Sequence, residues 1–164
     1  MKSYAKEIAK TNSAIKWKTS LGLEVEQVEY KSKKVKVSIG KGRKVEFKVY
    51  TDEIDTREHS KGLSPNFIHS LDATHLMMSI NGLKQVGIND VITVHDSFAT
   101  HANDVGKMSK VLRKAFVALH KKEILEELTE FFYERFEVEK KEIPYVDEEN
   151  FNLEEIMNSE YFFA

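Results

Sequence analysis

Two stretches of alternating apolar and polar residues, joined by a glycine-containing turn, constrain the fold of this chain most. Apolar side chains occupy every second position from Val35 to Ile39 and again from Val45 to Val49, and the turn between them reads Gly40-Lys41-Gly42-Arg43. A period of two is typical of a strand with one buried face, and the short glycine turn indicates a β-hairpin. We therefore expect the apolar face of this hairpin to pack on the protein.

Charge is distributed unevenly along the chain, although the net charge is only −2. Residues 31–48 contain eight Lys or Arg and one Glu, whereas residues 123–164 contain fourteen acidic and three basic residues. A concentrated positive face suits a phosphate backbone, although a solvated surface explains a charge run equally well. The lysines expected on the second face of the hairpin, as phosphate contacts, are Lys34, Lys36, Lys44 and Lys48.

The rest of the chain mixes helical and extended patterns, which predicts an α+β fold with helices packed around short antiparallel hairpins. Ser64 and Pro65 are typical of a helix start, so we expect a helix over 65–85 and a loop over 51–61. Further helices are expected near 2–10, 104–119, 124–136 and 153–157, and short strands near 14–17 and 25–28. We divide the chain into three parts, 1–61, 62–136 and 137–164.

Some classes of protein are disfavoured by what the sequence lacks. There is no cysteine, which excludes disulfides and thiolate metal sites. There is no run of about 18 apolar residues, so we expect no membrane-spanning helix. The first dozen residues resemble the tail of a helix without its beginning, and we expect the natural polypeptide or a partner to continue upstream.

A short β-branched strand ends in a His-Asp pair and is followed by a second extended segment, in the run Val91-Ile92-Thr93-Val94-His95-Asp96-Ser97-Phe98. This order predicts a hairpin with Asp96 at or near its tip. Carboxylate oxygen is the ligand that Mg²⁺ prefers, so Asp96 is a candidate metal ligand. The alternative is a turn aspartate that bonds its own backbone. A two-metal site needs at least one further carboxylate.

The helix expected over 65–85 presents His69, Asp72 and His75 at intervals of three residues. The two histidines lie about 120° apart around the helix, which makes a joint metal site awkward and a His-Asp pair easier. These residues line a substrate or nucleic-acid groove, or else they are buried polar groups that satisfy one another. A metal-dependent phosphohydrolase is one alternative function, and it would use His69, Asp72, His75, His95 and Asp96.

Taken together, several blocks of the sequence resemble the single-subunit DNA-directed RNA polymerases of phages and mitochondria. The first block is Ser64-Pro65-Asn66-Phe67-Ile68-His69-Ser70-Leu71-Asp72-Ala73-Thr74-His75-Leu76. The second block resembles motif C of the family's palm, the hairpin with the second catalytic aspartate: Val94-His95-Asp96-Ser97-Phe98-Ala99-Thr100-His101-Ala102. The end of the chain, Tyr161-Phe162-Phe163-Ala164, resembles the family's aromatic-rich tail. The resemblance implies the C-terminal part of a right-hand polymerase palm.

The resemblance also implies roles for individual residues. Asp96 would be the motif C aspartate that binds both catalytic Mg²⁺ ions, and His95 would lie beside the RNA 3′ end. His69 and Asp72 would line the active-site side of the palm, near the nascent pair and the template. The chemistry would be templated nucleotidyl transfer from nucleoside triphosphates. The C-terminal residues that would fold back towards the active site are Phe163 and Ala164.

One departure from the family is as informative as the matches. Motif A, with the first catalytic aspartate, and the fingers helix have no counterpart here, because Asp52 and Asp55 stand in the wrong context. We therefore expect a C-terminal fragment that is inactive alone and that needs an upstream polymerase portion, DNA template and RNA.

Self-association through the exposed interface is expected. We also expect a cytoplasmic location in a phage or bacterial host, with the mitochondrial matrix as the alternative. A non-catalytic nucleic-acid-binding relic is the remaining interpretation.

Overall fold

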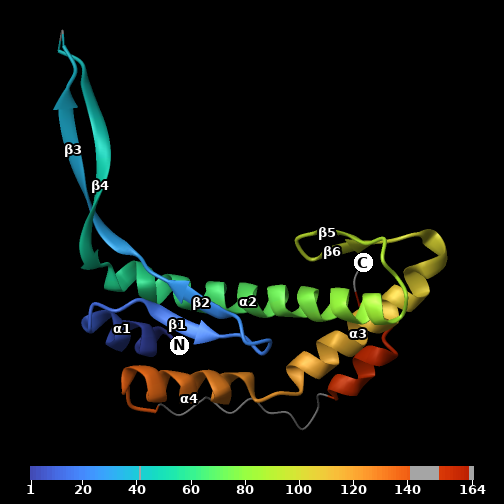
Figure 1. The fold of residues 1–164 in the computed structure, drawn as a ribbon. Coiled ribbons are helices and arrows are strands. Elements are labelled where there is room, and N and C mark those ends of the chain that lie inside the picture. Colours follow the sequence, from blue (N-terminus) through green and yellow to red (C-terminus); the bar gives the residue numbers. More distant parts are fainter. Residues whose placement is uncertain (41, 141–151, 163–164) are drawn as a thin grey trace.

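The computed structural model describes residues 1–40, 42–140 and 152–162, and its longest element is the helix α2 (Thr56–Gln85). Figure 1 shows α2 as a long axis with the other helices along it. The helices α1 (Lys2–Lys10) and α4 (Ile124–Phe136) lie at its N-terminal half, and α3 (Val105–His120) lies at its C-terminal half. Two 3₁₀ helices complete the helical part, η1 (Ala102–Asp104) and η2 (Leu153–Met157).

The strands of the described part form three separate antiparallel pairs. The pairs are β1 (Ile15–Lys18) with β2 (Glu24–Gln27), β3 (Tyr30–Ser38) with β4 (Lys44–Ile54), and β5 (Ile92–Val94) with β6 (Ser97–Ala99). The predicted α+β class, with helices packed around short antiparallel hairpins, is confirmed.

The prediction of a loop over 51–61 and a helix start at Ser64-Pro65 is wrong. Strand β4 continues to Ile54, and α2 begins at Thr56 with Asp55 as its N-cap. The Asp55 carboxylate accepts hydrogen bonds from the next two free amides, Arg57 N at 3.0 Å and Glu58 N at 3.1 Å. This cap starts the helix nine residues earlier than predicted, and α2 then passes through the boundary expected between the first two parts of the chain, at 61–62.

Neither α2 nor any other described helix has an apolar stretch long enough to cross a membrane.

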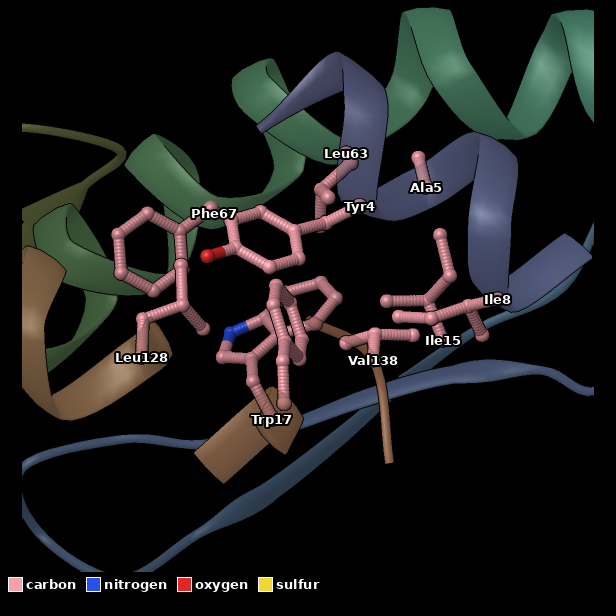
Figure 2. Close-up of a cluster of buried hydrophobic side chains, with 10 residues drawn as sticks. Tyr4, Ala5, Ile8, Ile15, Trp17, Leu63, Phe67, Leu128 and Val138 are labelled. Carbon is pink, nitrogen blue, oxygen red and sulfur yellow. The ribbon is translucent and has the colours of Figure 1, made fainter. Parts of the chain in front are cut away.

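The main core lies between α1, β1, α2 and α4, and Trp17 stands at its centre (Figure 2). The indole is fully buried, and its Nε1 donates to the hydroxyl of Ser70 at 3.0 Å. Phe67, one turn earlier in α2, meets the indole edge-on at 6.1 Å. The core residues labelled with Trp17 are Tyr4, Ala5, Ile8, Ile15, Leu63, Phe67, Leu128 and Val138, and the fully buried Phe132 belongs to the same cluster.

A second, smaller core joins the C-terminal end of α2 to α3. Leu83 from α2 packs with Met108 and Leu112 from α3. The two helices approach closely at Gly82, where an added Cβ would lie 2.8 Å from the Cγ1 of Val111. Phe98 from β6 is packed against the same cluster, so this core supports the β5–β6 hairpin.

The β3–β4 hairpin projects away from the N-terminal end of α2 (Figure 1). Its register pairs Val35 with Phe47 and Val37 with Val45, which confirms the predicted hairpin and its apolar face. The expectation that this face packs on the protein is wrong, because its six apolar side chains are 38–54% exposed. Alternation indicates which residues share a face, but whether a surface covers that face depends on parts of the fold distant in sequence.

Candidate functional site

The β5–β6 hairpin presents His95 and Asp96 as its two-residue turn. Val94 pairs with Ser97, and His95 and Asp96 between them are both exposed. His95 adopts a φ of +55°, a left-handed conformation that His tolerates better than most residues. The tight turn therefore holds the Asp96 carboxylate away from the sheet and open to solvent, as the sequence predicted.

Asp96 lies on the wall of a cavity of about 820 Å³ between the hairpin, α2 and α3. His69 and Asp72, exposed on one face of α2, lie on the same wall. No hydrogen bond joins these two side chains in the described part of the chain, so the expected His-Asp pair is not formed by them. The full lining is His69, Leu71, Asp72, Ala73, His75, Leu76, His95, Asp96, Phe98, Phe116 and His120.

His75 differs from the other histidines of the cavity because its ring is buried between α2 and α3. Its Nε2 lies 3.0 Å from the carbonyl oxygen of Leu112, to which it donates, and 3.3 Å from the hydroxyl of Ser79. Phe98 and Phe116 meet the imidazole edge-on at 6.2 and 5.6 Å. Burial lowers the pKa of His75, because the charged ring would lose its hydration.

His59 makes a second buried imidazole, at the root of the β3–β4 hairpin. Its Nε2 accepts a hydrogen bond from the backbone amide of Glu29 at 2.8 Å, which requires the neutral ring. Its Nδ1 is buried without a hydrogen-bond partner among the described residues. Burial again lowers the pKa, so the folded chain keeps His59 and His75 neutral.

These two histidines predict that the folded chain loses stability in mild acid. Unfolded histidines take up protons as the pH falls through about 6.5, whereas the folded state resists protonation, so stability is full above that pH and declines below it. Each histidine adds a slope of up to about 1.4 kcal/mol per pH unit. Urea unfolding at pH 7.5 and pH 5.5 measures the decline. His75→Gln should reduce it, whereas His101→Gln, at an exposed site, should not; equal declines in both variants would contradict the prediction.

As a metal site, the cavity is incomplete. The described residues contain no group of three or more His, Cys, Asp or Glu side chains placed to hold a metal ion. Asp96 offers two carboxylate oxygens suited to Mg²⁺, and it does so at an open position. The residues present therefore fit a two-metal site to which this chain contributes one carboxylate. The phosphohydrolase alternative brings its five residues to one cavity but lacks, within the described part of the chain, the self-sufficient metal cluster it needs.

The four lysines of the β3–β4 hairpin lie on one face, opposite the apolar one. Lys34 is paired across the ribbon with Lys48, and its Nζ contacts the Glu46 carboxylate at 2.6 Å. Lys48 also lies over the ring of Tyr50, with 5.1 Å to the centroid. All four side chains are exposed, so the outer part of this hairpin, which is about 30 Å long from root to tip, carries a positive face.

Two residues of α3 that line the cavity, Phe116 and His120, were given no site role from the sequence. His120 stacks on Phe116, one turn earlier in α3, with ring centroids 4.0 Å apart. Arg113, which does not line the cavity, joins the C-terminal segment to α3 through its bond to the carbonyl of Ile156. The spacing of Phe116 and His120 was a usable signal, whereas the partner of Arg113 lies 43 residues away. Phe163 and Ala164, expected near the active site, fall outside the described residues.

Comparison with known proteins agrees with this geometry. Residues 1–149 match the family model described as DNA-dependent RNA polymerase. The chain is 37% identical over 161 residues to the mitochondrial DNA-directed RNA polymerase 1 of Nicotiana sylvestris, covering 97% of this chain and 16% of that protein. It is 38% identical over 167 residues to the chloroplastic/mitochondrial DNA-directed RNA polymerase 2 of Arabidopsis thaliana, covering 97% of this chain and 15% of that protein.

A shorter relative matches along nearly its whole length. It is DNA-directed RNA polymerase 1A of Nicotiana tabacum, 37% identical over 158 residues, which cover 95% of this chain and 99% of that protein. The family model matches most of the chain, and the β5–β6 hairpin and the 64–76 block both lie within the matched residues. The chain therefore belongs to the family of phage- and mitochondrial-type DNA-dependent RNA polymerases.

Proposed function

We propose that this chain is the C-terminal palm segment of a DNA-directed RNA polymerase and that it supplies the motif C aspartate, Asp96. The observation that carries the proposal is the position of Asp96, at the tip of a tight hairpin over a cavity lined by residues of the 64–76 block. The reaction is templated nucleotidyl transfer. The RNA 3′ oxygen loses its proton and bonds the α-phosphorus, while the bond to the leaving pyrophosphate breaks.

The residues of the chain have separate tasks in this reaction. Asp96 supplies carboxylate oxygen to Mg²⁺, and when bound, Mg²⁺ stabilises charge on the attacking and leaving oxygens. His95, beside it in the turn, faces the RNA 3′ end. His69 and Asp72 on the cavity wall face the nascent pair and the template.

The proposal includes an upstream partner, because one aspartate is insufficient for two metal ions. The motif A aspartate and the fingers would come from a separate portion of the polymerase. The outer face of β5 suits such a partner, since Ile92 is 69% exposed and Val94 is 63% exposed. The chain spans about one sixth of the Nicotiana sylvestris relative, which leaves ample sequence for those parts.

Reconstitution tests the proposed function. The chain alone should not extend an RNA primer on a DNA template, because half of the metal site is missing. Addition of a separately expressed upstream portion with motif A and the fingers should restore extension from nucleoside triphosphates. Extension by the chain alone would contradict the fragment proposal. Failure of the mixture to extend, with both parts folded and bound to each other, would favour the non-catalytic relic.

The lysine face of the β3–β4 hairpin is proposed to contact the phosphate backbone of DNA. Neutralising its four lysines to Gln should weaken binding and lower the slope of log K against log salt by about 0.9 for each phosphate that no longer meets a lysine. DNA binding by the reconstituted polymerase, measured over a series of salt concentrations, gives the slope. The matched control neutralises four exposed lysines elsewhere, Lys10, Lys84, Lys110 and Lys114. An unchanged slope in the hairpin variant would refute this role.

Two smaller proposals concern assembly and location. The apolar face of the β3–β4 hairpin and the outer face of β5 would promote self-association when the upstream portion is absent. Of the two expected locations, the mitochondrial matrix agrees with relatives named mitochondrial, whereas the cytoplasm has no support among them. The division into parts 1–61, 62–136 and 137–164 remains a proposal.

A further inference from the structure

Arg113 is the only buried arginine among the described residues, at 9% exposure, whereas Arg43, Arg57 and Arg135 are exposed. No carboxylate of the described residues forms an ion pair with it. Its described partners are neutral: Nε donates to the Ser109 hydroxyl at 3.4 Å, and Nη1 donates to the carbonyl of Ile156. Burying a cation is costly, and neutral partners offset that cost only in part, so the contacts of Arg113 with the described residues indicate where it acts.

The contacts of Arg113 join α3 to the C-terminal segment 152–162. Besides its bond to Ile156 in η2, the guanidinium lies over the ring of Phe162, with 5.0 Å to the centroid. A second charged contact joins the same parts of the chain, between Lys121 and Glu154. It lies at the surface, and both side chains are more than half exposed. Exposed ion pairs contribute little to stability. Among the described residues, Arg113 therefore makes the principal polar contact that holds this segment on α3.

An unbroken series of ring contacts continues from the fastened segment to the Asp96 hairpin. Phe162 meets Phe116 edge-on at 5.3 Å, and Phe116 meets His75 at 5.6 Å. His75 in turn meets Phe98 at 6.2 Å. Phe98 is paired with Thr93 in the hairpin and lies two residues after Asp96. The C-terminal segment is thus linked, through successive ring contacts, to Phe98 in the hairpin that carries the carboxylate.

We infer that Arg113 is a positioning residue for Asp96. By holding Phe162 and η2 against α3, Arg113 keeps the series of rings packed against Phe98 of the β5–β6 hairpin. This support fixes the direction of the Asp96 carboxylate. The hairpin has only three residues in each strand, so it has little rigidity of its own and depends on this support. The inference rests on the proposed function, in which Asp96 is a metal ligand.

The test uses the reconstituted polymerase with Arg113→Gln in this chain. We expect the Mg²⁺ concentration for half-maximal extension to rise by about tenfold, as for other changes in groups that orient a metal ligand. High Mg²⁺ should restore most of the rate. A mere decrease in folded protein would lower the rate equally at every Mg²⁺ concentration, and that result would overturn the inference. Arg135→Gln, which removes an exposed arginine, should leave the Mg²⁺ requirement unchanged.

A second readout does not depend on activity. Hydrogen exchange of the assembled protein should show faster exchange in 153–158 and in 92–99 for Arg113→Gln, with the middle of α2 unchanged. Phe162→Ala should give the same pattern, and the double variant should exchange no faster than the more affected single variant, because both residues act through one contact. Faster exchange confined to 153–158 would overturn the inference.

The two proposals fail differently. If the mixture does not extend RNA, or if it still does so after Asp96→Asn, the proposed function fails. If wild type extends RNA and Asp96→Asn does not, but Arg113→Gln has the wild-type Mg²⁺ requirement and the wild-type exchange at 92–99, only the role of Arg113 fails.

Discussion

Replacement of Asp96 by Asn should lower RNA extension by the reconstituted polymerase by about a thousandfold or more, equivalent to about 4 kcal/mol of activation free energy. The amide has almost the shape of the carboxylate but no charge, so it is a poor ligand for a hard divalent cation. Asp96 is exposed and makes no hydrogen bond to the described residues. The free energy of unfolding should therefore change by no more than about 0.5 kcal/mol.

The matched control for this variant is Asp90→Asn. Asp90 is also exposed and precedes the same hairpin, but it lies 3.6 Å from the His101 imidazole rather than at the turn. Its replacement should leave extension within about twofold of wild type. Steady-state extension rates at saturating nucleotide measure both variants. If Asp96→Asn retained a tenth of the wild-type rate, the carboxylate would not be a catalytic metal ligand.

Replacement of Trp17 by Ala should give the largest decrease in stability, about 3–5 kcal/mol, because it removes a large side chain from a closed core. The indole is fully buried and sits among α1, α2 and α4, so no element can move in to fill the space without disturbing another (Figure 2). The replacement also removes the hydrogen bond to Ser70. A decrease of this size is a large fraction of the total stability of a typical domain, about 5–15 kcal/mol.

Urea unfolding followed by far-ultraviolet circular dichroism measures the effect of Trp17→Ala, since the variant has no tryptophan left to report by fluorescence. Tyr161→Ala is the control, because that aromatic ring is 77% exposed and its removal should cost no more than about 0.5 kcal/mol. A decrease below about 1 kcal/mol at Trp17 would mean that the α1–β1–α4 core is not closed around it.

Local patterns predicted the elements whose causes are local. The alternation from Val35 to Val49 identified the β3–β4 pairing, because strand pairing follows a period of two. The His95-Asp96 turn was found because a β-branched strand stops there. The start of α2 was missed, since Ser64-Pro65 is a strong start signal, yet Asp55 caps the helix earlier and Pro65 is accommodated inside it.

Features that depend on residues distant in the sequence could not be predicted from it. Nothing near Arg113 indicates that its partner is Ile156, and nothing near Trp17 indicates Ser70. The exposure of the apolar face of β3–β4 could not be predicted either, because residues outside the hairpin decide whether that face is buried. The cavity around Asp96 was predicted in part: the sequence indicated His69, Asp72, His75 and His95 as lining residues, but gave Phe116 and His120 no place there.

Because the β3–β4 hairpin projects far from the rest of the protein, a small change of angle at its root moves its tip a long way. Over a length of about 30 Å, a rotation of about 10° at its root would displace its tip by about 5 Å, more than one residue along a strand. The root is set by Glu29, whose amide bonds His59 and whose carbonyl accepts from Asp55 N at 2.8 Å, and by Asn12, which accepts from Ile54 N at 2.9 Å. The position of the lysines is therefore set by Glu29 and Asn12, two residues at the opposite end of the hairpin that carry no positive charge themselves.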